Sequence, residues 1–252
     1  KSNILIVDIQ HGLINDLIYY NFKNPYGKKG LPNIVLCWDN ISKNYLEKIL
    51  PDITTFVIGN PWISKLGEKN SNKFISIENK KLKPYISNKP AIVVTLQWKK
   101  NFTKQVIDIP IHIIDCLNKL INKGWDCWLR FHPAHFEEFD RETLHDKWNK
   151  KTNLKINPYN TFDLSDVALP FLLRHANVHI TNFSASIIEA KIMKVTSYIW
   201  CQDKNIKKKL LHEYLNSSYV KEASLKSDKL FKTLNRYRNK KKSSLNFSNL
   251  SK

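Results

Sequence analysis

The sequence predicts an α/β fold of the doubly wound, Rossmann-like kind, with two units that each contain a parallel sheet. Short apolar runs rich in β-branched residues alternate with stretches of helical period along most of the 252 residues. The connections between these runs are short, as in a sheet built from strand-helix-strand units. Polar segments follow directly on four of the apolar runs, at the strand ends where such sheets bind ligands.

The first unit is predicted from three apolar runs near the start of the chain. We expect strands at residues 4–9, 33–37 and 54–58, each followed by turn residues. Residues 42–50 have helical periodicity. The stretch 64–90 is rich in Lys, Asn and Ser and has little periodicity beyond a short run at 74–77, so we place a domain boundary in it.

The second unit is predicted to begin with a strand at 91–96. A helix over 104–122 follows, with Pro110 near its start and Gly124 at its C-terminal end. After it we expect strands at 126–131, 154–156, 178–181 and 195–200, and helices at 136–148, 167–175 and 184–193. The expected domains are therefore part of an N-terminal Rossmann-like domain with its linker (1–88), a C-terminal Rossmann-like domain (89–204) and a basic helical tail (205–252).

The composition describes a globular chain with a strongly positive surface. Hydrophobic residues make up 42% and aromatic residues 12%, with six Gly and ten Pro, which excludes a disordered or collagen-like chain. Forty-one Lys and Arg against 22 Asp and Glu leave a net charge of +19. We therefore expect an anionic partner: nucleotide, nucleic acid or acidic membrane. From Cys201 onward, 14 Lys or Arg against 4 Asp or Glu give +10, more than half of the excess.

The cysteines and the hydropathy pattern indicate the compartment. Cys37, Cys116, Cys127 and Cys201 form no CxxC pair, so we expect reduced thiols and a cytoplasmic protein. No uncharged apolar stretch approaches the roughly 20 residues of a membrane span. The chain opens on Lys1 and enters an apolar run at once, and we expect the N-terminal unit to be incomplete.

Four polar clusters follow predicted strands and are expected to face one crevice: Gln10-His11-Gly12, Gln97-Trp98, His132-Pro133 and Thr181 to Ser186. His132 would stand at a strand tip, in a turn fixed by Pro133, and donate to a phosphate oxygen. The alternative is a histidine that is satisfied within its own loop.

The segment Thr181 to Ser186 is the stronger phosphate signal. Ser184 stands at a predicted N-cap and Ser186 in the first turn, where unpaired N–H groups and hydroxyls favour an anion. Ser184 could equally cap only its own helix. Glu189, one turn along, would accept from a ribose hydroxyl or else be a solvated helix residue.

His11 is the candidate base. It lies between Gln10, which can hydrogen-bond, and Gly12, which allows close approach, and a histidine there could remove a proton from a sugar hydroxyl. The alternative is a turn histidine. No Walker A loop, GxGxxG fingerprint, nucleophile elbow or HExxH pair is present. His132 and His135 lack further ligands of zinc-site type, so we expect no metal.

Together these motifs resemble the two-domain GT-B glycosyltransferases of bacterial surface-polysaccharide synthesis, and most nearly those that use cytidine-nucleotide donors. His132-Pro133 with Ser184 and Ser186 look like the HP motif and the later Ser/Thr pair that hold the CMP phosphate in bacterial sialyltransferases. Gln10-His11-Gly12 resembles the WHG-like segment of teichoic-acid-type glycerol-phosphate polymerases. The acidic pair before Gly of many sialyltransferases has no clear counterpart, and Ala185 separates the two serines.

The resemblance implies a metal-independent glycosyltransferase without a cofactor, whose donor is a CMP- or CDP-linked sugar. Sialyl, Kdo or glycerol-phosphate transfer in capsule, lipopolysaccharide or other surface glycan synthesis would fit it, with a glycan or lipid-linked glycan as acceptor. Residues 1–88 would form the acceptor side and residues 89–204 the nucleotide side. His11 would be the catalytic base, and the nucleotide and its phosphate would be held by Gln97, His132, Pro133, Ser184, Ser186 and Glu189.

Two other functions remain open. A UDP-sugar 2-epimerase shares the architecture and would turn over a UDP-sugar without an acceptor. A nucleic-acid-binding protein is suggested by the net charge and by the run Arg236 to Lys242, although no RNA- or DNA-binding motif is present.

The tail contains two amphipathic basic segments, at 205–215 and 230–237. Such helices can lie on an anionic membrane surface, or pack back on the protein with a solvated basic face. We expect the first segment to pack across the first domain. We expect the residues after Tyr237 to contact a polyanion or the inner face of the cytoplasmic membrane.

Overall fold

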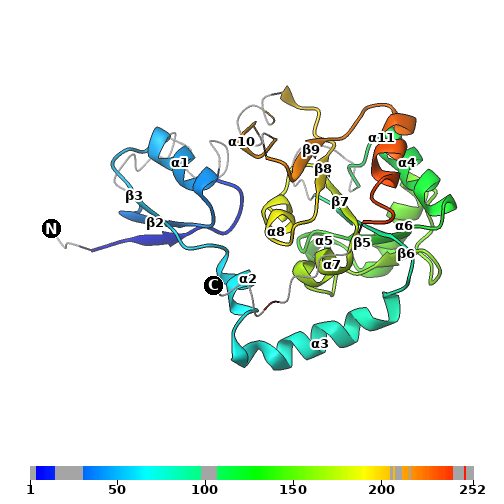
Figure 1. Ribbon diagram of the computed structural model, residues 1–252, viewed down its shortest axis with the longest axis horizontal. Coiled ribbons are helices and arrows are strands. Elements are labelled where there is room, and N and C mark those ends of the chain that lie inside the picture. The colour runs from blue at the N-terminus through cyan, green and yellow to red at the C-terminus, as the bar shows by residue number, and fades with distance from the viewer. Residues whose placement is uncertain are drawn as a thin grey trace. The chain divides into compact units, whose positions relative to one another are not determined.

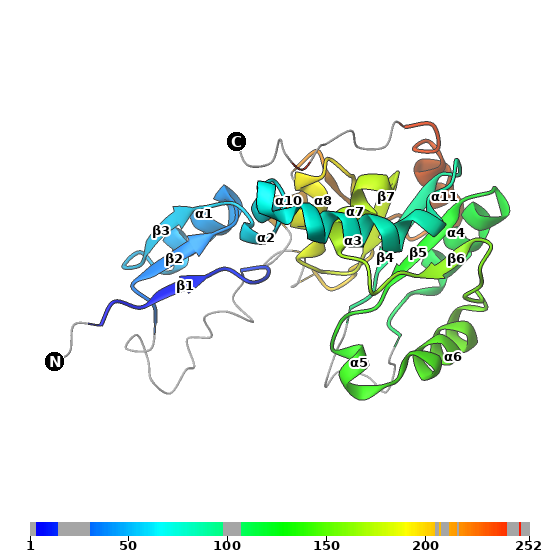
Figure 2. The ribbon, with the colours of Figure 1, turned by 90° about the horizontal axis from the view of Figure 1, so that it is seen from below.

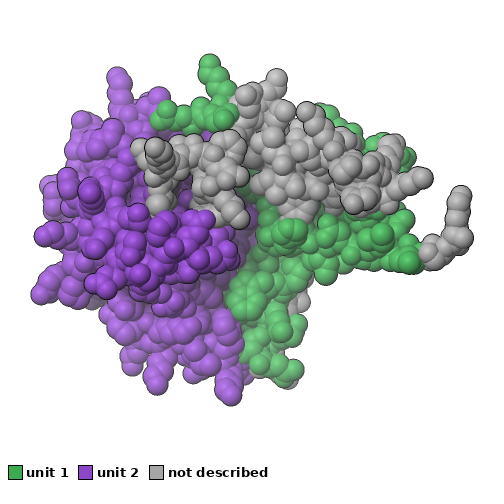
Figure 3. Space-filling view, turned by 180° about the vertical axis from the view of Figure 1, so that it is seen from behind, with its two compact units in different colours: residues 1–71, 202–216, 246–252 green, residues 72–201, 217–245 purple. Residues whose placement is uncertain are grey.

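The structure is a computed structural model that describes residues 4–14, 31–97, 107–204, 207, 212–215, 217–240 and 247. The chain divides into two compact units (Figures 1 and 3). Unit 1 contains residues 1–71, 202–216 and 246–252, and unit 2 contains residues 72–201 and 217–245. The chain therefore leaves unit 2 after its fifth strand, contributes a segment to unit 1, and returns.

Unit 1 has a three-stranded parallel sheet in the order β1-β2-β3, formed by β1 (Val7–Ile9), β2 (Ile34–Cys37) and β3 (Thr54–Val57). Helix α1 (Asn40–Ile49) connects β2 to β3 and begins where the Asp39 carboxylate accepts from the Ser42 N–H at 2.8 Å. Helix α2 (Pro61–Lys65) starts at a proline after the capping residue Asn60, and a short 3₁₀ turn, η2 (Lys69–Ser71), follows.

Unit 2 has a six-stranded parallel sheet in the order β6-β5-β4-β7-β8-β9. Its strands are β4 (Ala91–Thr95), β5 (Asp126–Arg130), β6 (Thr161–Asp163), β7 (Val178–Thr181), β8 (Ser197–Ile199) and β9 (Val220–Glu222). The chain adds strands outward from β4 in one direction, and then from β7 in the other. This is the strand order of dinucleotide-binding Rossmann sheets, whose ligands lie where the direction reverses, here between β4 and β7.

Helices cover both faces of this sheet (Figures 1 and 2). The first face packs against α4 (Ile111–Asn122), α6 (Arg141–Thr152) and α11 (Ser227–Asn235). The second face packs against α7 (Leu169–His175) and α8 (Ser186–Ile192), and α3 (Asn72–Leu82) lies against α7. The remaining short elements are η3 (Lys83–Tyr85), α5 (His135–Glu138) and α10 (His212–Leu215).

Side chains alternate between the two faces of the sheet along its central strands, and one face is apolar whereas the other is partly polar. Ile92 and Val94 of β4, and Ile180 of β7, join the apolar core on the first face. Thr95 and His179 occupy intervening positions and therefore point to the second face. Both are buried, so polar side chains lie inside the sheet-helix interface at the point where the strand order reverses.

Most predicted strands are confirmed, and β7 has the predicted bounds. The strand predicted at 154–156 is wrong, because β6 lies at Thr161–Asp163. Leu154 instead belongs to the connection after α6, where its carbonyl accepts from the Trp148 indole at 2.7 Å. The strand β9 was not predicted. The first three residues of the helix predicted over 104–122 lie outside the described residues, and α4 begins at Ile111, directly after Pro110.

Two further expectations need correction. The helix predicted over 136–148 is divided into α5 and α6, because Asp140 breaks the run and caps α6 by accepting from the Thr143 N–H at 2.7 Å. The stretch 64–90 contains the eleven-residue helix α3. The helix was missed because its composition is polar. Glu78 and Leu82 are the residues of α3 that are buried, so the sequence shows little apolar periodicity.

The described residues of both predicted tail segments pack against the protein. Tyr214 of α10 donates to the Asp39 carboxylate at 3.2 Å, so the described end of the first segment packs in unit 1 as expected. The apolar face of α11 buries Leu230 and Leu234 in unit 2, and Asn235 accepts from the Trp125 indole at 3.2 Å. Residues 241–246, in the final basic run, lie outside the described residues.

All four cysteines are buried and carry no disulfide bond. Within the described ranges, no helix is both long and apolar enough to cross a bilayer.

Candidate functional site

A row of three polar side chains crosses the end of the sheet in unit 2. Thr95 of β4 pairs in register with Arg130 of β5 on one side and with Thr181 of β7 on the other. Neighbours in register point to the same face of a sheet, so all three project toward α7 and α8. The row lies at the carboxyl ends of the strands, where doubly wound sheets bind ligands.

Hydroxyl groups connect this row to α8. The Thr95 hydroxyl donates to that of Thr181 at 2.8 Å, and Thr181 donates to the main-chain carbonyl of Thr95 at 3.0 Å. The Ser186 hydroxyl lies 3.1 Å from the Thr95 oxygen. Because the Thr95 proton is directed to Thr181, the Ser186 hydroxyl donates to Thr95 and fixes the first residue of α8 against the sheet.

His179 lies beneath the row and is fully buried. Its Nε2 is 2.9 Å from the Thr95 hydroxyl, and its Nδ1 is 2.8 Å from the Ser197 hydroxyl. The Thr95 proton is already used, so Nε2–H donates to Thr95 and Nδ1 accepts from Ser197. Burial lowers the pKa of His179 from 6.5 to about 3, which keeps the ring neutral in this network.

Arg130 and Glu189 are opposite charges at the same edge. Burial lowers the pKa of Arg130, and its Nε is buried without a hydrogen-bond partner among the described residues. Burial also raises the pKa of Glu189 from 4.5 to about 7, against the opposing effect of Arg130. Glu189 stands three residues after Ser186 on α8, on the same face of the helix. The site therefore holds a guanidinium whose Nε–H has no hydrogen-bond partner among the described residues.

The loop after β5 orients His132. The His132 N–H donates to Nδ1 of the buried His135 at 3.0 Å, and the Ala134 N–H donates to Nδ1 of His132 at 3.2 Å. Because Nδ1 of His132 is an acceptor, the neutral ring carries its proton on Nε2. Burial lowers the pKa of His132, and His135 and Arg130 lower it further. The ring is therefore a neutral donor near pH 7.

The turn before α8 differs in detail from the prediction. Ala185, rather than Ser184, occupies the N-cap, and the Ser184 hydroxyl accepts from the Ser186 N–H at 3.2 Å. Ser184 is partly exposed, whereas the Ser186 hydroxyl points inward to Thr95. Gln97 is partly exposed two residues after β4.

The predicted nucleotide-binding residues therefore all come after three adjacent strands of one sheet, either in the loop that follows the strand or on the helix after it. They are Gln97 after β4, His132 and Pro133 after β5, and Ser184, Ser186 and Glu189 after β7. Their individual roles stay predictions.

His11 belongs to unit 1 and the other predicted site residues belong to unit 2. His11 is exposed, and the buried Gln10 shapes its turn. The Gln10 amide donates to the carbonyl of Gly12 at 2.8 Å and to the Ser42 hydroxyl at 3.0 Å, and its oxygen accepts from the Trp38 N–H at 2.5 Å. Gln10 thus fixes the turn, and the basic role of His11 stays a prediction.

Three residues of this site were missed in the sequence: Thr95, Arg130 and His179. The signal that could have found them is a polar residue inside, or at the last position of, an otherwise apolar strand. The polar atoms of such a buried residue must form hydrogen bonds, either within the protein or with a ligand. Among the residues that the structure describes, no group of three His, Cys, Asp or Glu could hold a metal ion.

Solved structures show what this fold is similar to. A UDP-GlcNAc 2-epimerase from Neisseria meningitidis, bound to UDP-GlcNAc, has a TM-score of 0.60 at 15% identity, covering 99% of this chain and 67% of that chain. MnaA from S. aureus, solved with UDP, has a TM-score of 0.58 at 13% identity, covering 98% and 66%. The wall teichoic acid polymerase TagF has a TM-score of 0.59 at 12% identity, covering 100% and 62%.

No family model matches the sequence, and no curated protein matches it. The likeness to the solved structures concerns the fold, and it confirms the predicted class of two Rossmann-like units of GT-B type. The chain spans 62 to 67% of the lengths of these three structures.

Proposed function

We propose that this chain carries the nucleotide site of a GT-B glycosyltransferase that uses a nucleotide-activated sugar or related donor. The observation that carries the proposal is the buried Nε of Arg130, which has no hydrogen-bond partner in the described part of the chain and lies near the neutral His132 donor. Leaving a buried charged donor unsatisfied costs free energy that an anionic ligand would recover. The donor's phosphate is that ligand in this proposal.

The proposed chemistry is stabilisation of a leaving phosphate. Arg130 and the Nε2–H of His132 donate to the phosphate oxygens, and Ser184 and Gln97 add neutral donors. Fixed donors of this kind stabilise negative charge as it develops on the leaving group, so activity does not depend on a divalent cation. Glu189 accepts from a ribose hydroxyl, and Ser186 acts by fixing α8. His11 of unit 1 removes the proton of the acceptor hydroxyl.

The donor we propose is CMP- or CDP-linked, and the acceptor a glycan or a lipid-linked glycan. The likeness of fold to TagF, of which one structure was soaked with CDPG, supports the first choice. The likeness to a UDP-GlcNAc 2-epimerase bound to UDP-GlcNAc supports a second candidate, a UDP-sugar 2-epimerase. Incubation with UDP-GlcNAc and no acceptor separates the two, because only the epimerase converts the sugar in its absence.

Thermal unfolding with CMP, CDP, UDP and GDP tests the nucleotide site. A ligand that binds only the native state raises the unfolding midpoint. We expect Arg130→Met and His132→Ala each to weaken binding about tenfold or more, because a hydrogen bond to a charged group such as phosphate contributes about 1.5 to 3 kcal/mol. Arg236→Met, which removes an exposed cation from the end of α11, is the control and should bind normally. Unchanged binding by both site variants would rule out the phosphate site.

A further inference from the structure

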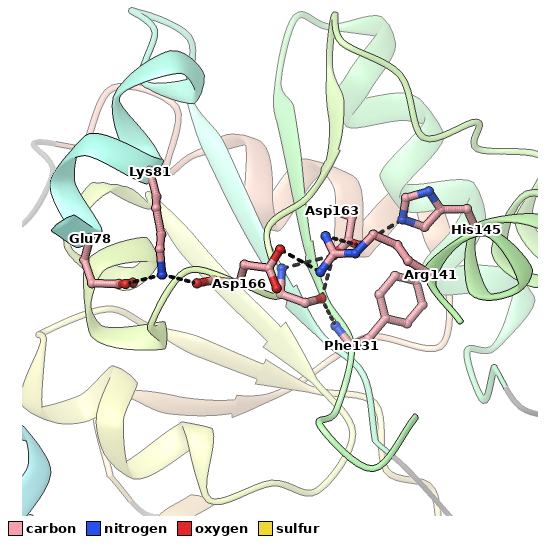
Figure 4. A network of polar contacts seen from close by, with 8 residues as sticks. Glu78, Lys81, Phe131, Arg141, His145, Asp163 and Asp166 are labelled. Atoms are coloured by element: carbon pink, nitrogen blue, oxygen red, sulfur yellow. Dashed lines mark hydrogen bonds and ion pairs between the residues drawn. The ribbon is translucent and has the colours of Figure 1, made fainter. Parts of the chain in front are cut away.

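A buried carboxylate on the last residue of β6 makes four polar contacts (Figure 4). The side chain of Asp163 is 3% exposed. Its Oδ2 lies 3.1 Å from Nη1 of Arg141 and 2.8 Å from Nε2 of His145. Its Oδ1 accepts from both the hydroxyl and the N–H of Ser165, at 2.5 and 3.0 Å. Asp163 is thus the centre of a network that joins the end of β6 to α6.

The network reaches the strand that carries the phosphate loop through Ser165. The last main-chain bond between β6 and β5 runs from the Leu164 N–H to the Leu129 carbonyl, at 2.9 Å. The next N–H on this side of the chain is that of Phe131, directly after β5, and it donates to the Ser165 hydroxyl oxygen at 2.9 Å. The proton of that hydroxyl is directed to Asp163, which leaves the lone pairs of the oxygen for Phe131. By accepting the proton of Ser165, Asp163 therefore orients the hydroxyl that accepts the last hydrogen bond between the β5 and β6 segments.

Aromatic contacts hold the same loop from the side of α6. The Phe131 ring stacks on His145 at 6.3 Å between centroids and meets Phe136 edge-on at 6.2 Å. The Arg141 guanidinium lies 5.3 Å from the Phe136 centroid while it also binds Asp163. Two residues that bind Asp163 thus contact Phe131, the first residue of the loop between β5 and α5, and Phe136, the second residue of α5.

We propose that Ser165 and Asp163 are positioning residues for His132, acting through the main chain of Phe131. The inference rests on the proposed function, because it gives His132 the phosphate-binding role described above. A donor contributes to a phosphate site only when its neighbours hold it in place, and hydrogen bonds from residues that never touch the ligand supply that restraint. Neither residue touches the nucleotide in this proposal.

Ser165→Ala removes the acceptor of the Phe131 N–H and is the direct test. Loss of one neutral hydrogen bond corresponds to roughly a twofold to tenfold effect, so we expect the dissociation constant for CDP or UDP, measured calorimetrically, to rise by that factor. Ser165→Thr keeps the hydroxyl and should restore binding. Asp166→Asn is the matched control, because Asp166 binds the same Arg141 at 2.7 Å, whereas the Phe131 N–H is bound by Ser165.

A double-mutant cycle shows whether the effect passes through His132. If Ser165 acts by positioning His132, Ser165→Ala has no further effect on nucleotide binding in the His132→Ala background. Equal effects of Ser165→Ala in both backgrounds would overturn the inference and leave the phosphate site intact. Unchanged binding by His132→Ala alone would also overturn the inference, whereas unchanged binding by both His132→Ala and Arg130→Met would contradict the proposed function.

Amide hydrogen exchange without nucleotide provides a readout independent of ligand binding. We expect Ser165→Ala to speed exchange in residues 131–136 about twofold to tenfold, and Asp166→Asn to leave it unchanged. Unaltered exchange in Ser165→Ala, with an unaltered unfolding midpoint, would show that Ser165 does not restrain the loop. That result would overturn the inference whatever the nucleotide measurements show.

Discussion

His179 on β7 and Glu189 on α8 have pKa values shifted toward opposite protonation states. Burial lowers the pKa of His179 from 6.5 to about 3, and raises that of Glu189 from 4.5 to about 7. Between pH 4.5 and 6.5 His179 is protonated in the unfolded chain and neutral in the native state. In the same range the native state keeps a proton on Glu189 that the unfolded chain releases.

The two shifts have opposite effects on the free energy of unfolding. His179 stabilises the native state above pH 6.5, and this contribution is lost as pH falls toward 3. Glu189 makes its largest contribution below pH 4.5, and this is lost as pH rises through about 7. Each group changes the free energy of unfolding by at most about 1.4 kcal/mol per pH unit. Because the two changes have opposite signs, they nearly cancel between pH 4.5 and 6.5.

We therefore predict that Glu189→Gln makes stability rise more steeply with pH between 5 and 6.5, by up to about 1.4 kcal/mol per unit. His179→Asn should have the reverse effect on the slope and should lower stability at pH 7.5, because the Thr95 and Ser197 contacts are altered. Urea unfolding across this range measures both slopes. Parallel curves for the wild type and the two variants would contradict the opposed titrations.

At the scale of elements, α11 is an integral part of unit 2. Its buried face packs on α4, and Leu234 is fully buried. We predict that Leu234→Ala lowers the free energy of unfolding by about 2 to 5 kcal/mol, the usual cost of a cavity in a core. Lys229→Ala, on the exposed side of the same helix, should change it by less than about 0.5 kcal/mol. A similar small effect of both substitutions in chemical unfolding would show that α11 is not packed as described.

The sequence predicted the elements that have strong patterns and missed those whose stability comes from the sheet. The buried strand β7 alternates the β-branched apolar residues Val178 and Ile180 with His179 and Thr181, and its bounds were predicted correctly. The three-residue strands β6 and β9 are too short to show a period, and they exist because neighbouring strands pair with them. Helix α3 was missed because most of its surface faces solvent.

The candidate site was predictable only in part, for a related reason. His132 and Ser184 lie in turns, where a polar residue is visible as an interruption between apolar runs. Arg130 and His179 lie inside strands, and their importance depends on which residues pair with them across the sheet. Register is a property of the folded sheet, so a single sequence without homologues does not show it.

At the scale of the whole molecule, the net charge of +19 predicts binding to anionic surfaces. The cationic run after Tyr237 is our candidate for membrane contact. We expect the triple substitution of Lys240, Lys241 and Lys242 by Gln to weaken binding to phosphatidylglycerol vesicles about tenfold or more, since each charge contributes about 1 kcal/mol. The control replaces Lys73, Lys80 and Lys83, which are exposed on or beside α3. Equal losses in both variants of a sedimentation assay would indicate general charge attraction instead.

The central claim is that a nucleotide phosphate binds at the edge of unit 2 where the strand order reverses. A crystal structure with CDP or UDP bound tests this most directly. We predict phosphate oxygens within about 3 Å of the Arg130 guanidinium and of Nε2 of His132, with the ribose beside Glu189. A nucleotide bound elsewhere, with Arg130 and His132 free of it, would contradict the account.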